Sequence, residues 1–197
     1  MHDSAVHQDP MTWFEAWFAD ARKDEPFDPT AMALATVDAS GRPSVRMVLL
    51  KGADARGFFF VTNYESRKAR DMEATGRAAL CLHWPKHERQ VRVEGTVERV
   101  SAEDSDTYFA SRPRGSQIGA WASHQSRPLP HREELVHRIR ELEREYHERD
   151  IPRPAHWGGL RVVPHRIELW QGRPSRLHER TLFEREGEGW RRTELYP

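Results

Sequence analysis

Cations and hydrogen-bond donors crowd one polar segment near the middle of the chain. The segment SRPRGSQIGAWASHQS covers residues 111–126 and follows a tyrosine. Its donors, with that tyrosine, are Tyr108, Arg112, Arg114, Ser116 and Gln117. Guanidinium and hydroxyl groups at this density suit an oxyanion such as phosphate. The alternative is a surface loop whose arginines pair with neighbouring acids.

Two further groups of basic residues also suit a phosphate. Ser66, Arg67 and Lys68 begin a predicted helix directly after a predicted strand, where free N–H groups and the positive end of the helix dipole favour anions. A capped helix with solvated bases is the alternative. Arg46 and Lys51 bracket the apolar run MVLL, and strict alternation would place them on opposite faces of a strand. A common ligand would then need a bulge or a contact at each end, and snorkelling edge residues are the alternative.

A titratable group occurs near the C-terminus, in WQGRPSRLHER. Arg176 and His178 lie two residues apart, so an extended chain would place a permanent cation and an imidazole on one side. A structural histidine is the alternative. The pair His83 and His87 has no further ligands at metal spacing and is interrupted by Pro85, so we expect no metal site.

Composition narrows the class of partner. Lys plus Arg number 31 and Asp plus Glu number 31 in 197 residues, so no overall field favours a nucleic acid or an anionic membrane, and the expected ligand is small. The only cysteine, Cys81, lies in an apolar run, which excludes a disulfide framework and fits a reducing, cytoplasmic setting. The sequence shows neither a membrane span nor a secretion leader.

The elements that would position these residues are mostly strands. Apolar residues at helical spacing predict a helix over residues 11–25, followed by prolines. Three apolar or alternating runs between residues 31 and 62 predict an antiparallel meander. Helices are predicted from Ser66 to Gly76, from Ser101 through a Ser-x-x-Asp cap, and over residues 131–150. In residues 89–100 Val91 and Val93 share one parity, so one face of that strand is core and the other is available for chemistry.

This order of elements predicts a mainly β fold with peripheral helices. Six or seven short strands with few interleaved helices favour a closed or nearly closed barrel. We expect one domain over residues 1–197, with an N-terminal helical arm at 1–28 and a barrel with helical insertions at 29–197. Four aromatic residues of the first helix, Trp13, Phe14, Trp17 and Phe18, together with the apolar strands, exceed what one small barrel can bury, which predicts a dimer.

Six separated motifs, in this order and spacing, resemble the pyridoxamine 5′-phosphate oxidase family. They are TAMALATVD…GRPSVRMVLLKG, FFFVTNYESRKARDME, ERQVRVEGTVERVS, YFASRPRGSQIGAWASHQS, WGGLRVVPHRIELWQG and SRLHER. The resemblance implies a split β-barrel homodimer that binds FMN at the subunit interface. It also implies oxidation of pyridoxamine or pyridoxine 5′-phosphate to pyridoxal 5′-phosphate, with O2 as electron acceptor and H2O2 as product.

The resemblance also assigns site residues. It implies FMN contacts at Arg46, Met47, Val48, Leu49, Leu50, Lys51, Val61, Thr62, Arg67, Lys68, Gln90, Gln125, Ser126, Trp170 and Arg180. It implies a substrate-phosphate site at Lys51, Tyr108, Arg112 and Ser116. Arg176, Leu177 and His178 would contact the substrate, with Arg176 and His178 as the catalytic pair over its pyridine ring.

The chain departs from the family pattern at its start and at single positions. Family members often carry an arginine and a tyrosine in an N-terminal arm over the substrate, and MHDSAVHQDPM has neither. Val61, Gly115 and Glu179 replace an aromatic residue and two aspartates that are common in the family.

Three other interpretations stay open. The first is a related FMN oxidase of the phenazine-pathway type, which is expected to lack the phosphate site of Lys51, Arg112 and Ser116. The second is a non-catalytic flavin-binding module of the same barrel. The third is a structural or interaction domain that binds no flavin.

Overall fold

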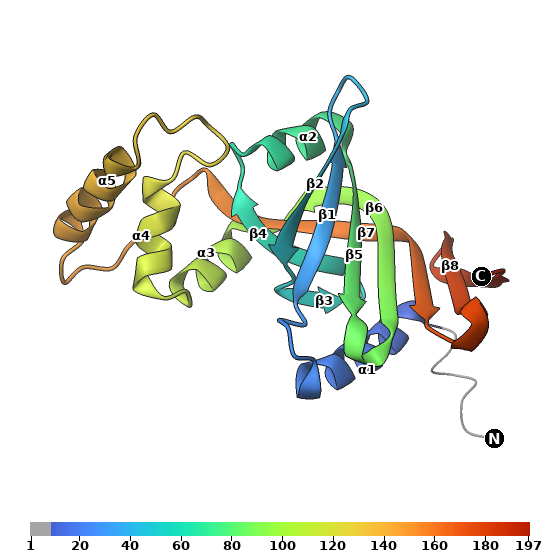
Figure 1. Ribbon diagram of the computed structural model, residues 1–197. Coiled ribbons are helices and arrows are strands. Elements are labelled where there is room, and N and C mark those ends of the chain that lie inside the picture. The colour runs from blue at the N-terminus through green and yellow to red at the C-terminus, as the bar shows by residue number, and fades with distance from the viewer. Residues whose placement is uncertain (1–8) are drawn as a thin grey trace.

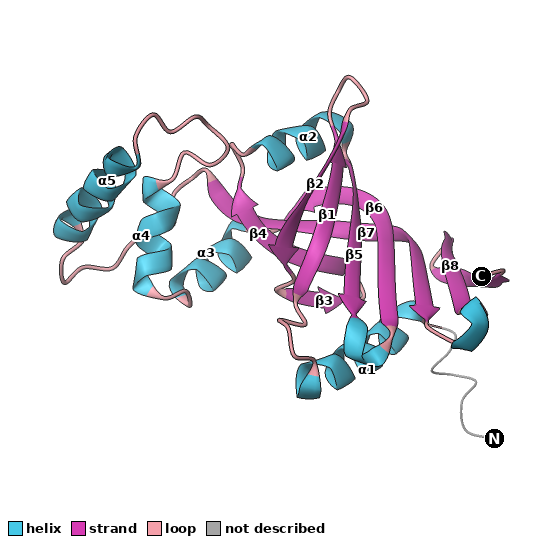
Figure 2. Ribbon diagram, in the orientation of Figure 1, coloured by secondary structure: helices cyan, strands magenta, loops and turns pink. Residues whose placement is uncertain are grey.

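A nine-stranded antiparallel sheet forms the centre of the part of the chain that the structure, a computed structural model, describes: residues 9–197. Helices lie around this sheet, as Figures 1 and 2 show. The strands are β1 (Ala31–Val37), β2 (Pro43–Leu49), β3 (Gly52–Asp54), β4 (Gly57–Asn63), β5 (Arg77–Trp84), β6 (Arg89–Arg99), β7 (Trp157–Gln171), β8 (Glu179–Glu186) and β9 (Gly189–Leu195). The helices are α1 (Pro10–Asp24), α2 (Arg67–Thr75), α3 (Ala102–Ala110), α4 (Arg114–Ala122) and α5 (Arg132–Glu145), with short 3-10 turns η1 (Pro85–His87) and η2 (Pro174–Arg176). The predicted mainly β fold with peripheral helices is confirmed.

The strand order is β2-β1-β5-β6-β7-β4-β3, and β8 and β9 extend the sheet from β7. The sheet is not closed, because β2 contacts β4 without pairing with it. The predicted meander is therefore wrong at its third strand: β4 pairs with β3 and β7. Gly57 permits this pairing, since it has a φ of 130° and a Cβ there would lie 2.1 Å from the carbonyl oxygen of Val162.

The first helix packs its aromatic face into the chain's own core. Asp9 caps α1 by accepting hydrogen bonds from the N–H groups of residues 11 and 12, and Pro10 is its first residue. Phe14 and Trp17 are buried in the main apolar cluster, and Trp13 and Phe18 pack against that cluster. These side chains therefore do not supply the surplus apolar surface from which the sequence predicted a dimer. Residues 1–8 of the predicted N-terminal arm lie outside the described residues.

The helices after β6 form a second, smaller apolar cluster beside the sheet. Ser101 caps α3, as predicted, by accepting from the N–H of Asp104. The following polar segment forms α4, which the sequence did not predict, and α5 packs against it. Figure 1 shows α4 and α5 projecting from one side of the sheet, while β8 lies at the other side. Within residues 9–197, no helix has the length and apolar character needed to cross a membrane.

Candidate functional site

A cleft of about 640 Å³ opens between the end of β2, β4 and the helices α3 and α4. The predicted binding residues in its lining are Met47, Val48, Leu49, Lys51, Val61, Thr62, Lys68, Tyr108, Arg112, Ser116 and Gln125. The remaining lining residues are Asn63, Ser111, Pro113, Gly119, Ala120, Ser123 and Trp157. Among residues 9–197, three cations and no acidic side chain line the cleft. The positive potential is thus local, in a chain whose formal net charge is zero.

One cation of the cleft, Lys68, lies in the first turn of α2, directly after β4. Its ammonium donates to Thr62 Oγ1 and Ser66 Oγ, each at 3.1 Å, and to Gln125 Oε1 at 2.8 Å. Burial, with a smaller contribution from the charge of Arg46, lowers the pKa of Lys68 to about 8. An ammonium that has lost water and gained only neutral acceptors is suited to a bound anion.

A second cation, Arg112, follows α3 at the same cleft. Its guanidinium carbon lies 4.5 Å from the ring centroid of Trp157 and 5.7 Å from that of Phe109. Its Nη1 is buried and has no hydrogen-bond partner among the described residues, and burial lowers the pKa of the guanidinium. A buried N–H group without an acceptor is costly, and a phosphate oxygen would supply that acceptor.

Three other predicted phosphate ligands line the same cleft as Arg112. Tyr108 belongs to α3, Ser116 to the first turn of α4, and Lys51 follows β2. Lys51 therefore lies beyond the end of the strand, and the alternation that separated it from Arg46 does not apply to it.

Two donors that the sequence grouped with these residues are used elsewhere. Arg114 donates to the carbonyl oxygens of Tyr146 and Arg149, which fixes α4 to the end of α5. Gln117 Nε2 donates to the carbonyl oxygen of Phe109 at 3.0 Å. Neither side chain lines the cleft.

Some predicted cofactor contacts lie outside the lining of the cleft. Arg46 donates to the carbonyl oxygen of Leu34 at 2.8 Å, and its Nη2 lies 3.9 Å from Asp71 Oδ2. Burial lowers the pKa of the Arg46 guanidinium. Arg67 is exposed at the start of α2, and Leu50 is buried in the core.

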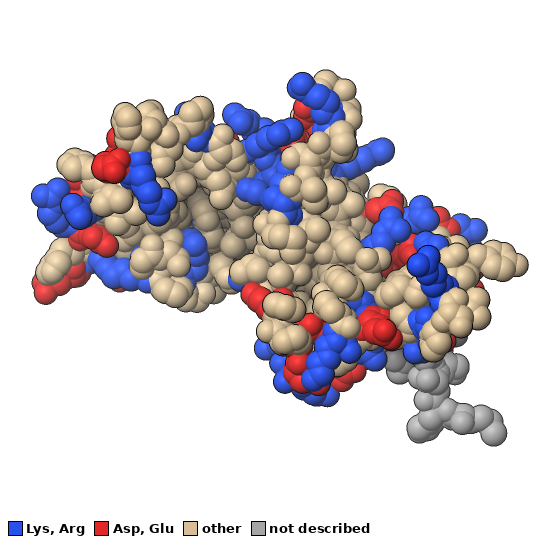
Figure 3. Space-filling view, in the orientation of Figure 1, with Lys and Arg blue, Asp and Glu red and all other residues tan. Residues whose placement is uncertain are grey.

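An exposed apolar row follows the edge strand β2. Val45, Met47 and Leu49 alternate along it and are 68%, 64% and 41% exposed. Figure 3 shows basic side chains beside α2 and a largely uncharged surface over β1 and β2. An apolar row on an open sheet edge is typical of a protein-protein contact.

A second group of predicted residues forms a row across β6, β7 and β8. Gln90 is paired with Trp170, and Trp170 is paired with Arg180, so the three side chains share one face of the sheet. Glu168 lies on this face, only 5% exposed. Its carboxylate accepts from Arg180 Nε at 2.8 Å and from Arg92 Nη1 at 3.1 Å. The buried carboxylate thus fixes the direction of Arg180.

The predicted catalytic pair lies beside this row, in the turn between β7 and β8. Arg176 and Leu177 are exposed, and Arg176 has a φ of 61°, in the left-handed region. The His178 ring centroid lies 4.6 Å from that of Trp170. His178 Nδ1 accepts from the backbone N–H of Arg173 at 3.2 Å, so the neutral imidazole carries its proton on Nε2.

The strand β7 connects the two groups. Its first residue, Trp157, lines the cleft, and Trp170 belongs to the row near its other end. About 40 Å of extended strand lies between them, at about 3.3 Å per residue. Figure 1 accordingly shows α3 and α4 on one side of the sheet and β8 on the other. Within one chain, the cleft and the row are separate.

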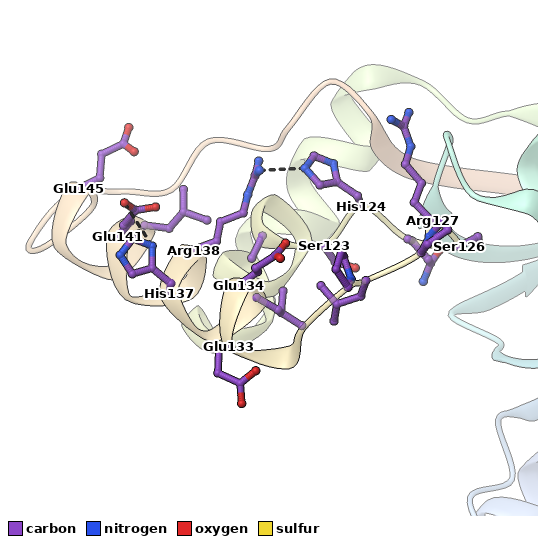
Figure 4. A pocket seen from close by; sticks show the side chains of 17 residues that line it. Ser123, His124, Ser126, Arg127, Glu133, Glu134, His137, Arg138, Glu141 and Glu145 are labelled. Atoms are coloured by element: carbon purple, nitrogen blue, oxygen red, sulfur yellow. Dashed lines mark hydrogen bonds and ion pairs between the residues drawn. The ribbon is translucent and has the colours of Figure 1, made fainter.

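A larger cavity of about 940 Å³ lies between α5 and the segment that follows α4 (Figure 4). Its lining mixes acids and bases: Arg138 Nη1 lies 2.8 Å from His124 Nε2, and His137 Nδ1 lies 3.5 Å from Glu141 Oε1. Ser126 lines this cavity and not the cleft. Because four glutamates, Glu133, Glu134, Glu141 and Glu145, belong to its lining, the cavity is less suited to a phosphate than the cleft is.

Sequence reasoning did not single out Trp157 or Glu168. Trp157 carries no charge or hydroxyl and stands in the sequence only as the first residue of the motif WGGLRVVPHRIELWQG. Glu168 could have been found from the sequence, because it is an acid inside the apolar run IELW, where a buried carboxylate needs cationic partners.

Comparison with known proteins identifies the family. Residues 18–145 match the family model for pyridoxamine 5′-phosphate oxidase, and residues 157–197 match the pyridoxine 5′-phosphate oxidase C-terminal dimerisation region. A pyridoxine/pyridoxamine 5′-phosphate oxidase of Rubrobacter xylanophilus is 58% identical over 99% of this chain and 90% of its own length. Another, of Gluconobacter oxydans, is 54% identical over 96% of this chain and 94% of its own length.

Two solved structures share the fold. PhzG of Burkholderia lata 383, crystallised with tetrahydrophenazine-1-carboxylic acid, is 34% identical, with a TM-score of 0.91 over 96% of this chain and 93% of that one. A pyridoxamine 5′-phosphate oxidase-related, FMN binding protein of Nostoc punctiforme PCC 73102 has a TM-score of 0.76 at 18% identity, over 98% of this chain and 100% of that one. The second likeness concerns the fold alone. With both family models and relatives above 50% identity over nearly its whole length, this chain belongs to the pyridoxamine 5′-phosphate oxidase family.

Proposed function

We propose that this protein is an FMN-dependent oxidase that converts pyridoxamine or pyridoxine 5′-phosphate to pyridoxal 5′-phosphate, with O2 as acceptor and H2O2 as product. The observation that carries the proposal is a cleft whose lining, within residues 9–197, holds three cations and no acidic side chain. Two of these cations, Lys68 at the start of α2 and Arg112 after α3, lie in different elements and suit two phosphate groups, one on the flavin and one on the substrate.

The residues present fit a flavin mononucleotide. Lys68 would hold the phosphate at the start of α2, where the helix dipole also favours an anion. A dinucleotide would need a second phosphate site with a glycine-rich turn, and the sequence contains no GxGxxG motif. When bound, the isoalloxazine ring supplies the hydride acceptor for the reaction.

We infer that the working unit is a homodimer. One flavin would contact both the cleft and the row formed by Gln90, Trp170 and Arg180. Within one chain, however, the row and the cleft lie at opposite sides of the sheet. A twofold dimer would bring the row of one subunit to the cleft of its partner. The exposed apolar row on β2 and the match of residues 157–197 to a dimerisation region support this assembly.

The chain's own residues would then hold and orient the substrate. Lys51, Tyr108, Arg112 and Ser116 would bind its phosphate, which fixes one end of the molecule. Arg176 from the partner subunit would orient the pyridine ring and stabilise developing charge. His178, with its proton on Nε2 when neutral, would support that alignment or donate to the substrate.

A second candidate function comes from the structural likeness to PhzG, whose crystal structure holds a phenazine carboxylic acid. That ligand carries a carboxylate in place of a phosphate, and a carboxylate offers fewer acceptor oxygens to the donors of the cleft, Lys51, Tyr108, Arg112 and Ser116, than a phosphate does. The named oxidase relatives are also more similar in sequence, at 54% and 58% identity against 34%. Both facts favour the phosphorylated substrate.

An aerobic assay tests the proposal. Protein saturated with FMN is mixed with pyridoxamine 5′-phosphate, and aldehyde and peroxide are followed together. We expect equal amounts of the two products, and no turnover of pyridoxamine that lacks the phosphate at the same concentration. Flavin that binds without being reduced by the substrate under anaerobic conditions would favour a non-catalytic flavin module.

A further inference from the structure

We propose that Trp157 is the positioning residue of the phosphate site: its indole ring holds Arg112 and Tyr108 in the orientation that receives the substrate phosphate. The proposal rests on the proposed function, which assigns those two residues to the phosphate. The Arg112 guanidinium carbon lies 4.5 Å from the indole centroid. The Tyr108 ring is stacked on the indole at a centroid distance of 6.3 Å and an interplanar angle of 15°.

The indole is a fixed platform, because its backbone is bonded to β4 and, through Arg153, to α3. Trp157 is the first residue of β7 and pairs with Asn63 on β4. Its carbonyl oxygen accepts from Arg153 Nη1 at 2.7 Å, and Arg153 Nε donates to Asp106 Oδ1 on α3 at 2.6 Å. Phe109 on the same helix packs edge-on against the indole at 5.2 Å. The platform and the helix that carries Tyr108 therefore move together.

The residue after the platform restricts it further. A Cβ at Gly158 would lie 2.2 Å from the hydroxyl oxygen of Tyr64, so the chain beside β4 is packed as closely as glycine permits. Trp157 itself is only 5% exposed. A ring buried to this extent has no space in which to change rotamer without displacing its neighbours.

An aromatic platform has an advantage that a carboxylate would not have. A carboxylate beside Arg112 would neutralise the guanidinium and occupy the N–H groups that a phosphate needs. The indole face stabilises the cation through its π electrons and leaves the N–H edge free. The buried, unpartnered Nη1 of Arg112 agrees with this division of roles.

The experiment compares Trp157→Leu and Trp157→Phe with the control Trp121→Leu. Trp121 packs against the same apolar cluster, and its indole contacts Tyr146 and His156 and does not line the cleft. Inorganic phosphate is titrated by calorimetry into protein saturated with FMN. We expect phosphate to bind about 30-fold more weakly to Trp157→Leu and about 5-fold more weakly to Trp157→Phe, which keeps an aromatic face. Trp121→Leu should bind phosphate as the wild type does.

A double-mutant cycle separates positioning from general packing. In an Arg112→Ala background, Trp157→Phe should cause no further loss of phosphate affinity, because the cation that the ring positions is gone. In steady-state assays Trp157→Phe should raise KM for pyridoxamine 5′-phosphate and change kcat less than twofold, an order-of-magnitude expectation for about one lost binding contact.

Three results would overturn the proposal: unchanged phosphate binding in both Trp157 variants, an equal loss in Trp121→Leu, or fully additive effects in the cycle. Failure of the proposed function gives a different result. A wild type that binds phosphate without oxidising pyridoxamine 5′-phosphate would refute the oxidase, and the calorimetric comparison of the variants would still decide the role of Trp157.

Discussion

FMN binding should weaken as the pH rises above about 8, because the proposed phosphate ligand Lys68 then loses its proton. Burial and the nearby charge of Arg46 lower the pKa of Lys68 to about 8. Its three hydrogen-bond acceptors, on Thr62, Ser66 and Gln125, carry no charge that would hold the proton. Below pH 8 the Lys68 side chain is already protonated in the flavin-free protein. Above pH 8 binding must also take up a proton, so the dissociation constant rises with pH.

The size of this effect follows from the pKa. A group with a pKa of about 8 is almost fully protonated at pH 7 and about one-tenth protonated at pH 9, so Kd should rise about tenfold between these values. The upper limit is the contribution of the charge-assisted hydrogen bond itself, about 1.5–3 kcal/mol, or about 10- to 150-fold in Kd.

The assay is quenching of flavin fluorescence during titration of flavin-free protein at pH 7, 8 and 9 and constant ionic strength. The matched control is Lys68→Arg, because a guanidinium stays charged throughout this range and should remove the pH dependence. Lys68→Gln should bind FMN about 10- to 150-fold more weakly at pH 7, with no slope. If Lys68→Arg kept the slope of the wild type, another group would be titrating and Lys68 would not be the phosphate ligand.

Three further predictions concern the substrate, the reaction and the assembly. Arg112→Ala should lower kcat/KM for pyridoxamine 5′-phosphate about 10- to 150-fold through the lost charge-assisted bond, with an unchanged flavin spectrum; loss of flavin as well would contradict its assignment to the substrate phosphate. Arg176→Ala should keep the dimer and FMN yet slow anaerobic flavin bleaching by about 100-fold, and bleaching at the wild-type rate would mean that the reaction depends on other residues. Met47→Asp should place a charge on the exposed apolar row, so the protein should be a monomer in light scattering and should bind FMN weakly. An intact dimer would mean that the interface lies elsewhere.

Local signals in the sequence predicted their elements well. The cap at Ser101 and the left-handed Gly76, with a φ of 68°, lie where the sequence placed them, because capping depends on a few adjacent residues. The alternation of Val91 and Val93 also identified the buried face of β6. Long-range pairing had no such signal. Nothing near β4 in sequence indicates that its partner is β7, which begins about a hundred residues later.

The helix α4 shows the limit of local reasoning. Pro113 at its start gives no side-chain cap, and Gly115 and Gly119 lower its helix propensity. Packing of Ile118 into the second apolar cluster stabilises it, and such packing is invisible in the segment itself.

The candidate site was predictable as a set of residues but not as two separated groups. The resemblance assigned Lys68, Arg112 and Trp170 to one site, because sequence motifs do not tell how far apart residues lie within one folded chain. Only the pairing of β6, β7 and β8 reveals that Trp170 lies far from the cleft of its own chain. For the same reason the sequence does not reveal that Trp157 lies beside Arg112 and Tyr108.

The length of β7 has a consequence for how this protein tolerates insertions and deletions. Trp157 at one end lines the cleft, and Trp170 near the other end belongs to the row across β6 and β8. Successive side chains of a regular strand point to opposite faces, so adding or removing one residue between the two tryptophans, away from the register shift that β7 already has opposite Glu94 and Gly95, would turn one of them to the wrong side of the sheet. A bulge could absorb the change only by displacing the neighbouring strands. Point substitutions along β7 should therefore be accepted far more often than a change in its number of residues.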